Sequence, residues 1–161
     1  MVTDEKYAII FDKNGNCGTF FNYAGSVYEF NKEMLKVQMD KITKEQAIEE
    51  FRKQLVNCAL FGKTLVVSVD ILRPDFVTEW VGDAETLPAT LFNFKEWRKE
   101  ENHMQIVRKD ENRSMMGDAN NYCMATDGFT IIFLAAYKSD QDITDFCNRI
   151  PCSDQMDKII V

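Results

Sequence analysis

The fold of this chain is decided by the stretch TLVVSVD, residues Thr64–Asp70. Its apolar residues follow one another almost without interruption, whereas a strand with one face in water alternates between apolar and polar residues. Such a run is typical of a strand buried on both faces, and these strands occur in parallel sheets that are covered by helices. A second aliphatic run, Phe129–Ala136, predicts another buried strand of the same sheet.

The segment before Thr64 has the pattern of an amphipathic helix. Thr43 and Gln46 match a capping box at its start, and Gly62 is a natural stop at its end. This pattern predicts a helix over residues 43–61. Apolar residues recur in it at helical spacing, at Ala47, Ile48, Phe51, Leu55, Cys58 and Ala59.

Shorter elements complete the pattern. We expect a strand at 103–108, a polar loop at 109–127, a helix from Ser139 or Asp140 to Asn148, and a last strand at 158–161. Helices therefore alternate with buried strands, which indicates an α/β fold with a mostly parallel sheet flanked by helices. An α+β arrangement is the alternative.

The first 30 residues predict a β-hairpin. Residues 7–11 and 19–23 are short apolar runs. The Asn14-Gly15 step between them supplies the positive φ that a tight turn needs. This hairpin is expected to extend one edge of the sheet.

The composition is that of a globular domain. The 161 residues include 12 Phe, 5 Tyr and 2 Trp, and 45% of the residues are apolar, which excludes a disordered chain. A chain of this length buries roughly two-thirds of its unfolded surface and has the size of one domain. We expect a single domain over 1–161, with the hairpin at about 6–30 and a helix–strand core at about 43–161.

Charge and cysteine content bear on partners and setting. A net charge of −7 without a dense run of Lys or Arg argues against nucleic-acid binding. No apolar run approaches the roughly 20 residues of a membrane span, and the polar N-terminus does not resemble a secretory signal. The five cysteines are odd in number and include no C-x-x-C pair, which favours reduced thiols in the cytoplasm.

The sequence DKNGN at residues 12–16 is similar to the start of an EF-hand calcium loop. That loop needs a Gly at position 6 and a bidentate Glu at position 12, where this chain has Cys17 and Tyr23. We therefore interpret the segment as a hairpin turn, with a small calcium-binding module as the second alternative. No zinc site is expected, because His103 is the only histidine, and its expected role is in packing or at the surface.

Two segments contain parts of a nucleotide site. Gly62-Lys63-Thr64 matches the tail of a phosphate-binding loop, but it follows a helix and precedes a strand, the reverse of the order in such loops. Asp70 ends an aliphatic strand as a metal-orienting Asp does, but Ile71 stands where a second acid is usual. We therefore expect no catalytic residue, cofactor or bound nucleotide, and a degenerate nucleotide-binding domain is the first alternative.

Aromatic residues cluster between residues 76 and 97, on segments without strong periodicity. They are either core residues or a docking surface for another protein, because Trp, Phe and Arg are enriched at interfaces. The candidate interaction surface comprises Phe76, Trp80, Phe92, Phe94, Trp97 and Arg98.

Three stretches resemble a degenerate AAA-type ATPase segment of the dynein heavy-chain kind. They are NCALFGKTLVV at 57–67, Gly117-Asp118 followed by FTIIFLA at 129–135, and FCNRI at 146–150. The resemblance implies an α/β core related to nucleotide-binding folds and a cytoskeletal or ciliary setting. Because no phosphate-binding loop precedes the helix, it also implies a fold that is kept as an interaction surface after its activity was lost.

These observations favour a non-catalytic structural or interaction protein. We expect it to bind other proteins of a larger intracellular assembly, such as a ciliary axoneme or another cytoskeletal complex. Nucleic acids and membranes are not among its expected partners.

Overall fold

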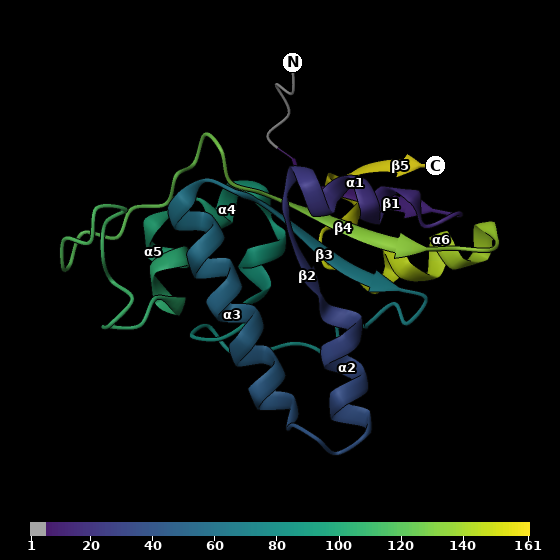
Figure 1. The fold of residues 1–161 in the computed structure, drawn as a ribbon, viewed down its shortest axis with the longest axis horizontal. Coiled ribbons are helices and arrows are strands. Elements are labelled where there is room, and N and C mark those ends of the chain that lie inside the picture. Colours follow the sequence, from purple (N-terminus) through teal and green to yellow (C-terminus); the bar gives the residue numbers. More distant parts are fainter. Residues whose placement is uncertain (1–5) are drawn as a thin grey trace.

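The computed structural model describes residues 6–161 and contains a five-stranded parallel sheet (Figure 1). The strands lie in the order β2-β3-β4-β1-β5, and every neighbouring pair is parallel. The predicted α/β fold is therefore confirmed, and the two long aliphatic runs form adjacent strands. The bounds are β1 (Ala8–Asp12), β2 (Ser26–Glu29), β3 (Thr64–Asp70), β4 (Thr130–Ala136) and β5 (Asp157–Ile160).

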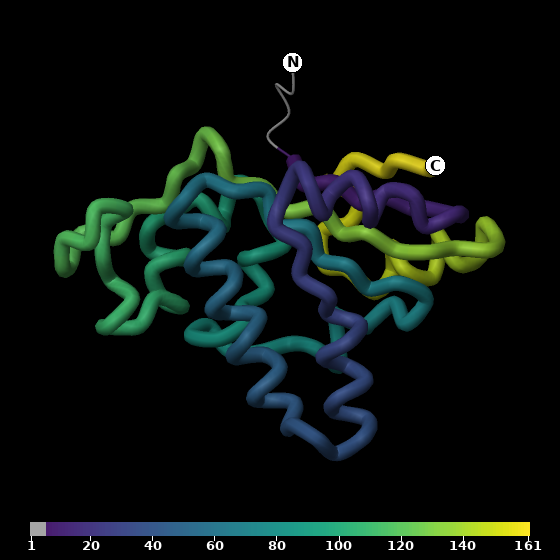
Figure 2. The backbone as a smooth tube through the Cα atoms, viewed as in Figure 1, coloured from purple at the N-terminus to yellow at the C-terminus, as the bar shows by residue number. Residues whose placement is uncertain are grey.

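Helices surround this sheet within the described residues. The α-helices are α1 (Asn16–Ala24), α2 (Phe30–Gln38), α3 (Lys44–Phe61), α4 (Phe94–Trp97), α5 (Glu100–His103) and α6 (Asp140–Asn148). The 3₁₀ helices are η1 (Ala89–Phe92), η2 (Met104–Ile106) and η3 (Ser153–Gln155). Figure 2 shows that α2 and α3 run side by side away from the sheet to the turn that joins them.

Helix α3 begins and ends as the sequence predicts. The backbone N–H of Gln46 donates to Oγ1 of Thr43 (3.2 Å), and the backbone N–H of Thr43 donates to Oε1 of Gln46 (2.9 Å). These two bonds complete the capping box. Gly62 ends the helix at a φ of 65°, a left-handed conformation that glycine adopts without strain.

Helices cover the two faces of the sheet unequally. Crossovers between parallel strands are right-handed, so the direction in which a connection moves across the sheet decides which face its helix covers. The connection from β1 to β2 moves one way and carries α1, whereas all later connections move the other way. In Figure 1, α1 lies above the sheet and α2 and α3 extend below it, and Phe146 of α6 packs in the same large core as α2 and α3.

Alternate residues of β1, β2, β3 and β4 enter two separate cores. On β3, Val67 belongs to the large core on the face with α2 and α3, whereas its neighbour Val66 belongs to the small core on the α1 face. The small core comprises Ile10, Val66 and Leu134, with Cys17, Phe21, Val27 and Ile132 packed against them. One nine-residue helix is therefore the main cover of this face within the described residues.

The predicted N-terminal hairpin is wrong. Residues 16–24 form α1, and β2 lies at the edge opposite β5, paired with β3 rather than β1. Gly15 has a positive φ of 74°, but it precedes the first turn of a helix instead of closing a tight turn. Cys17 and Phe21, one helical turn apart, pack on the sheet, whereas Tyr23 is 90% exposed, so the apolar run follows helical geometry.

Two further segments differ from expectation. Residues 103–108 are predicted as a strand, but 103–106 form the end of α5 and η2, in which His103 and Ile106 are both buried at helical spacing, and 107–108 are irregular. Helix α2 is not among the predicted elements, although its sequence carries a helical pattern. Phe30, Met34 and Val37 recur at that spacing and all contact the core.

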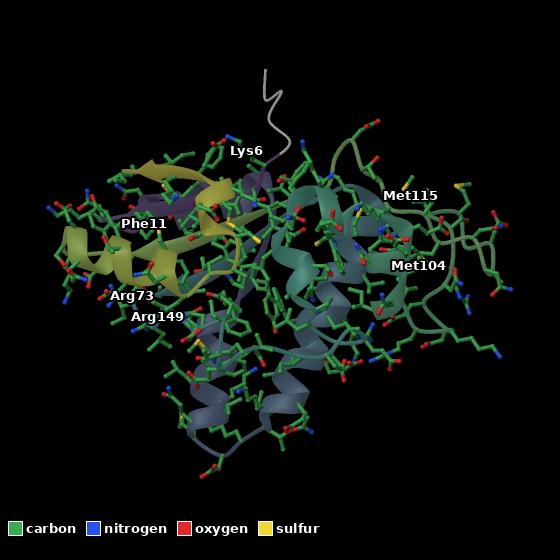
Figure 3. The ribbon with its side chains drawn as sticks, turned by 180° about the vertical axis from the view of Figure 1, so that it is seen from behind. Lys6, Phe11, Arg73, Met104, Met115 and Arg149 are labelled. Atoms are coloured by element: carbon green, nitrogen blue, oxygen red, sulfur yellow. The ribbon has the colours of Figure 1, made fainter. Side chains whose placement is uncertain are left out.

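Arg52 of α3 anchors the long segment between β3 and β4. Its side chain is only 1% exposed, and its guanidinium donates to the carboxylates of Glu49 (2.6 Å) and Glu111 (2.7 Å) and to the carbonyl of Ile106 (2.7 Å). The buried charge is therefore fully paired. Glu111 lies in the predicted polar loop, which extends away from the sheet to Met115 at its outer end (Figure 3).

Candidate functional site

The carboxyl ends of the central strands form the place where ligands bind in sheets of this type. In open parallel sheets, ligands bind in the crevice between two neighbouring strands whose following connections lead to opposite sides of the sheet. Here it lies between β1, whose connection leads to β2, and β4, whose connection leads to β5. The crevice measures about 210 Å³ and is lined by Asp12, Gly15, Gly18, Ser68, Asp70, Leu134, Ala135 and Ala136.

Asp12, the last residue of β1, directs its carboxylate at the start of α1. The side chain is nearly fully buried. Its Oδ1 accepts the backbone N–H groups of Asn14 (3.1 Å) and Gly15 (3.0 Å), and its Oδ2 accepts that of Cys17 (2.7 Å). N–H groups at a helix start lack partners within the helix and attract anions. The carboxylate of Asp12 thus occupies the position at this helix start where a bound anion would lie.

These hydrogen bonds keep Asp12 charged. Burial alone would raise the pKa of its carboxyl, but the bonds from the backbone of Cys17, Asn14 and Gly15 outweigh burial and lower that pKa. The thiol of Cys17 shifts the other way, because burial and then the Asp12 carboxylate raise its pKa. The crevice therefore holds a fixed negative charge, whereas the thiol of Cys17, which packs against the small core, stays protonated and is a poor nucleophile.

Asp70 adds a second carboxylate to the crevice. It is exposed at the end of β3, has a φ of 51°, and follows a register shift between β3 and β4. Asp70 therefore lines the same crevice as Asp12 and Gly15 of the loop after β1, although the two segments are far apart in the sequence. None of the described residues that line the crevice is Lys or Arg, so no lining cation offsets the two carboxylates.

Two arginines hold the turn that follows Asp70 against α6. Arg73, at a φ of 42°, pairs with the carboxylate of Asp142 (2.7 Å), and a guanidinium nitrogen of Arg149 donates to the carbonyl of Arg73 (3.0 Å). Figure 3 shows the two arginines side by side. The hydrogen bond from Arg73 is the main reason that the pKa of Asp142 is lowered. The end of β3 is thereby fixed in place.

Gly62-Lys63-Thr64 lies at the opposite end of the sheet from this crevice. Thr64 begins β3 and Asp70 ends it, and a strand of this length spans roughly 20 Å. The strand–loop–helix position of a phosphate-binding loop is occupied instead by residues 12–16. The sequence pattern that could have indicated this helix start is Asp12, three residues before Gly15, followed by the apolar residues Cys17 and Phe21, which are one helical turn apart.

The loop at residues 12–16 presents hydrogen-bond donors to Asp12 rather than ligands to a metal ion. Both oxygens of Asp12 already accept N–H groups. Within residues 6–161, no three His, Cys, Asp or Glu side chains are grouped as a metal ion requires. His103 is buried with Nδ1 3.1 Å from the carbonyl of Trp97, and burial lowers its pKa, as in a packing histidine.

Most of the predicted interaction surface lies in the core. Phe76, Trp80, Phe92 and Trp97 are each at most 3% exposed, so these four are packing residues rather than a docking surface. The reason is that the irregular segment after β3 folds under the sheet, where Phe76 and Phe92 contact each other (5.4 Å between ring centroids). Phe94 is partly exposed, with the partly exposed Arg98 guanidinium 3.2 Å from its ring centroid.

A larger hollow lies between α2 and α3. It measures about 690 Å³, compared with about 210 Å³ for the crevice at Asp12. Its lining comes from β2, α2, the turn after α2, and α3. Sequence reasoning misses this groove because α2 is not predicted.

No family model, curated protein or solved structure matches the chain. In the part of the chain that the structure describes, no helix combines the length and the apolar character needed to cross a membrane. The geometry of the crevice and of the groove is therefore the basis for a functional proposal.

Proposed function

We propose that this chain is a non-catalytic structural protein that works by binding other proteins in a larger intracellular assembly. The observation that carries the proposal is the carboxylate of Asp12, which accepts the backbone N–H groups with which the loop after β1 could hold a phosphate. Asp70 places a second negative charge in the same crevice. Nucleotides are polyanions, so both carboxylates oppose their binding.

The assembly that we propose is cytoskeletal, such as a ciliary axoneme or another cytoskeletal complex. This part rests on the resemblance of residues 57–67 and 129–135 to dynein heavy-chain segments. Five free thiols fit a reducing, cytoplasmic compartment. The α2–α3 pair, which extends from the sheet and carries an open groove, supports a role in protein binding (Figure 1).

A degenerate nucleotide-binding domain is the second candidate function. The observation that favours it is the loop between β1 and α1, which stands at the switch point of the sheet as a phosphate-binding loop does. For a phosphate to bind there, the Asp12 carboxylate would have to leave the three N–H groups that it now occupies.

Nucleotide titration separates the two candidates. Any ligand that binds only the folded state raises the melting temperature. Since we expect no nucleotide or calcium site, millimolar ATP or GTP with Mg²⁺, and likewise excess Ca²⁺, should leave the melting temperature unchanged. A saturable rise with a nucleotide that Asp70→Asn changes in either direction would place the nucleotide in this crevice and overturn the non-catalytic proposal in favour of the second candidate. A saturable rise with Ca²⁺ alone would favour a calcium-binding module instead.

Affinity purification from ciliated cells tests the binding half of the proposal. The tagged chain is expected to carry tubulin or dynein components in stoichiometric amounts. Recovery of the chain alone, as a monomer in sedimentation, would overturn a role in a stable assembly.

A further inference from the structure

The groove between α2 and α3 has charged walls along its length. The wall from α3 carries Glu45, Glu49 and Glu50, and these residues repeat along about one and a half helical turns. The wall from α2 contributes Glu33. Because α2 and α3 extend beyond the sheet, the groove lies on a projecting part of the molecule (Figures 1 and 2).

The charges of the groove are unbalanced. Four carboxylates and two ammonium groups line it. Both lysines are already paired within the groove: Lys36 with Glu33 at 2.7 Å, and Lys53 with Glu50 at 3.0 Å. The lining alone therefore has a net charge of −2, but Arg52 beneath it pairs with Glu49, so Glu45 is the one carboxylate of the lining without an ion pair among the described residues.

The two remaining carboxylates differ in their partners. Glu49 is bound by Arg52, whose side chain lies beneath the surface and also binds Glu111, and Arg108 lies 3.8 Å from its other oxygen. Glu45 is exposed and forms no ion pair with any described residue. An incoming cation thus meets an unpaired carboxylate, Glu45, at the first turn of α3, and a turn further along a partly exposed carboxylate, Glu49, that it shares with two arginines.

The groove also has an apolar part, formed by Tyr28 and Ile42. Tyr28 of β2 stacks on Phe51 (5.4 Å between ring centroids), and Ile42 packs against the large core. The hydroxyl oxygen of Tyr28 is buried and has no hydrogen-bond partner among the described residues. Burial, followed by the charges of Glu33 and Glu50, raises the pKa of this hydroxyl, so it stays protonated and able to donate.

We propose that the α2–α3 groove binds a basic amphipathic helix of a partner protein. Apolar side chains of that helix cover Tyr28 and Ile42, while its Lys or Arg side chains reach Glu45 and Glu49. This is the helix-in-groove mode of recognition, with charge complementarity setting the orientation. The inference rests on the proposed function and names the class of partner through which it operates.

A pair of synthetic helices tests the proposal with the intact chain. One 15-residue peptide carries Leu at helical spacing with Lys and Arg on the flanking positions, and its counterpart has Glu at each basic position. We expect the basic peptide alone to bind, with amide shifts in ¹⁵N spectra at residues 28–53 and weaker binding as salt rises. Equal binding of both peptides, or shifts elsewhere only, would overturn the proposal.

Charge-reversal variants provide the matched control. Glu45→Lys combined with Glu50→Lys is expected to weaken binding of the basic peptide by about fivefold or more, because the carboxylate of Glu45 is lost and two new positive charges on the groove wall repel the peptide. Glu79→Lys combined with Glu101→Lys makes the same change in net charge at exposed positions outside the groove and should leave binding unchanged. If both double variants weaken peptide binding equally, then the effect comes from the net charge of the protein, and the assignment of the binding site to the groove is overturned.

The outcome is distinguishable from a failure of the proposed function. If the basic peptide does not bind, while nucleotides leave the melting temperature unchanged and the assembly is recovered, then the groove assignment is wrong and the non-catalytic role stands. If nucleotides bind the crevice at Asp70, the proposed function fails whatever the peptide does.

Discussion

The two faces of the sheet are held in different ways. On the face with α2 and α3, the strands pack against several helices and aromatic rings, such as Phe92 against Phe133 (5.9 Å between centroids). On the opposite face, α1 covers a core of three buried residues and leaves Phe20 and Tyr23 exposed. The first face is therefore stabilised mainly by packing, whereas the second combines a small core with the hydrogen bonds that Asp12 accepts from the start of α1.

Two neighbouring valines test this comparison most directly. Val66 and Val67 are both fully buried on β3 but point to opposite faces. We expect Val67→Ala to lower the free energy of unfolding by about 2–3 kcal/mol, because the large core cannot close the cavity. Val66→Ala should cost only about 1–2 kcal/mol, because α1 can move toward the sheet. Urea unfolding measures both, and a larger loss at Val66 would contradict the comparison.

The same valines show why part of the fold could be predicted. A strand covered on both faces needs apolar residues at successive positions, and this requirement is visible in residues 64–70 without any tertiary information. Helix α3 could be predicted for a similar reason, because its capping box and its stop at Gly62 are local interactions.

The start of the chain could not be predicted in this way. A positive φ at Gly15 is compatible with a tight turn and also with a helix start, and only the strand order decides between them. Asp12 lies at the end of a strand, so its role as the anion of α1 depends on where β1 sits in the sheet. The burial of Trp80 and Trp97 likewise depends on how an irregular segment folds back under the sheet.

Removal of the Asp12 carboxylate is expected to have the next largest effect. Asp12→Ala leaves the N–H groups of Asn14, Gly15 and Cys17 without their acceptor, which should cost about 1–2 kcal/mol in the free energy of unfolding, as for other lost helix caps. Amide exchange should rise in α1 before it rises in α3. Equal acceleration in both helices would show that the carboxylate does not hold α1 specifically.

The pH dependence of this contribution has a definite sign. The pKa of Asp12 is lower in the folded protein, so its stabilising effect is complete above the unfolded value of about 3.9 and is lost as pH falls toward the folded value. The difference in unfolding free energy between wild type and Asp12→Asn should therefore be constant near neutral pH and shrink below about pH 4. A difference that grows on acidification would contradict the assignment of Asp12 as the charged group.

The smallest expected effect is at the outer surface of α1. Tyr23 is 90% exposed, so Tyr23→Ser should change the free energy of unfolding by less than about 0.5 kcal/mol, whereas Phe21→Ser, which removes a ring packed on Ile10 and its neighbours, should cost clearly more. Urea unfolding at two protein concentrations measures both. If Tyr23→Ser destabilises the protein as much as Phe21→Ser, and does so only at the higher concentration, then a second copy covers the α1 face in solution. In that case the face that α1 alone covers in a single chain is covered by a second copy in the stable form of the protein.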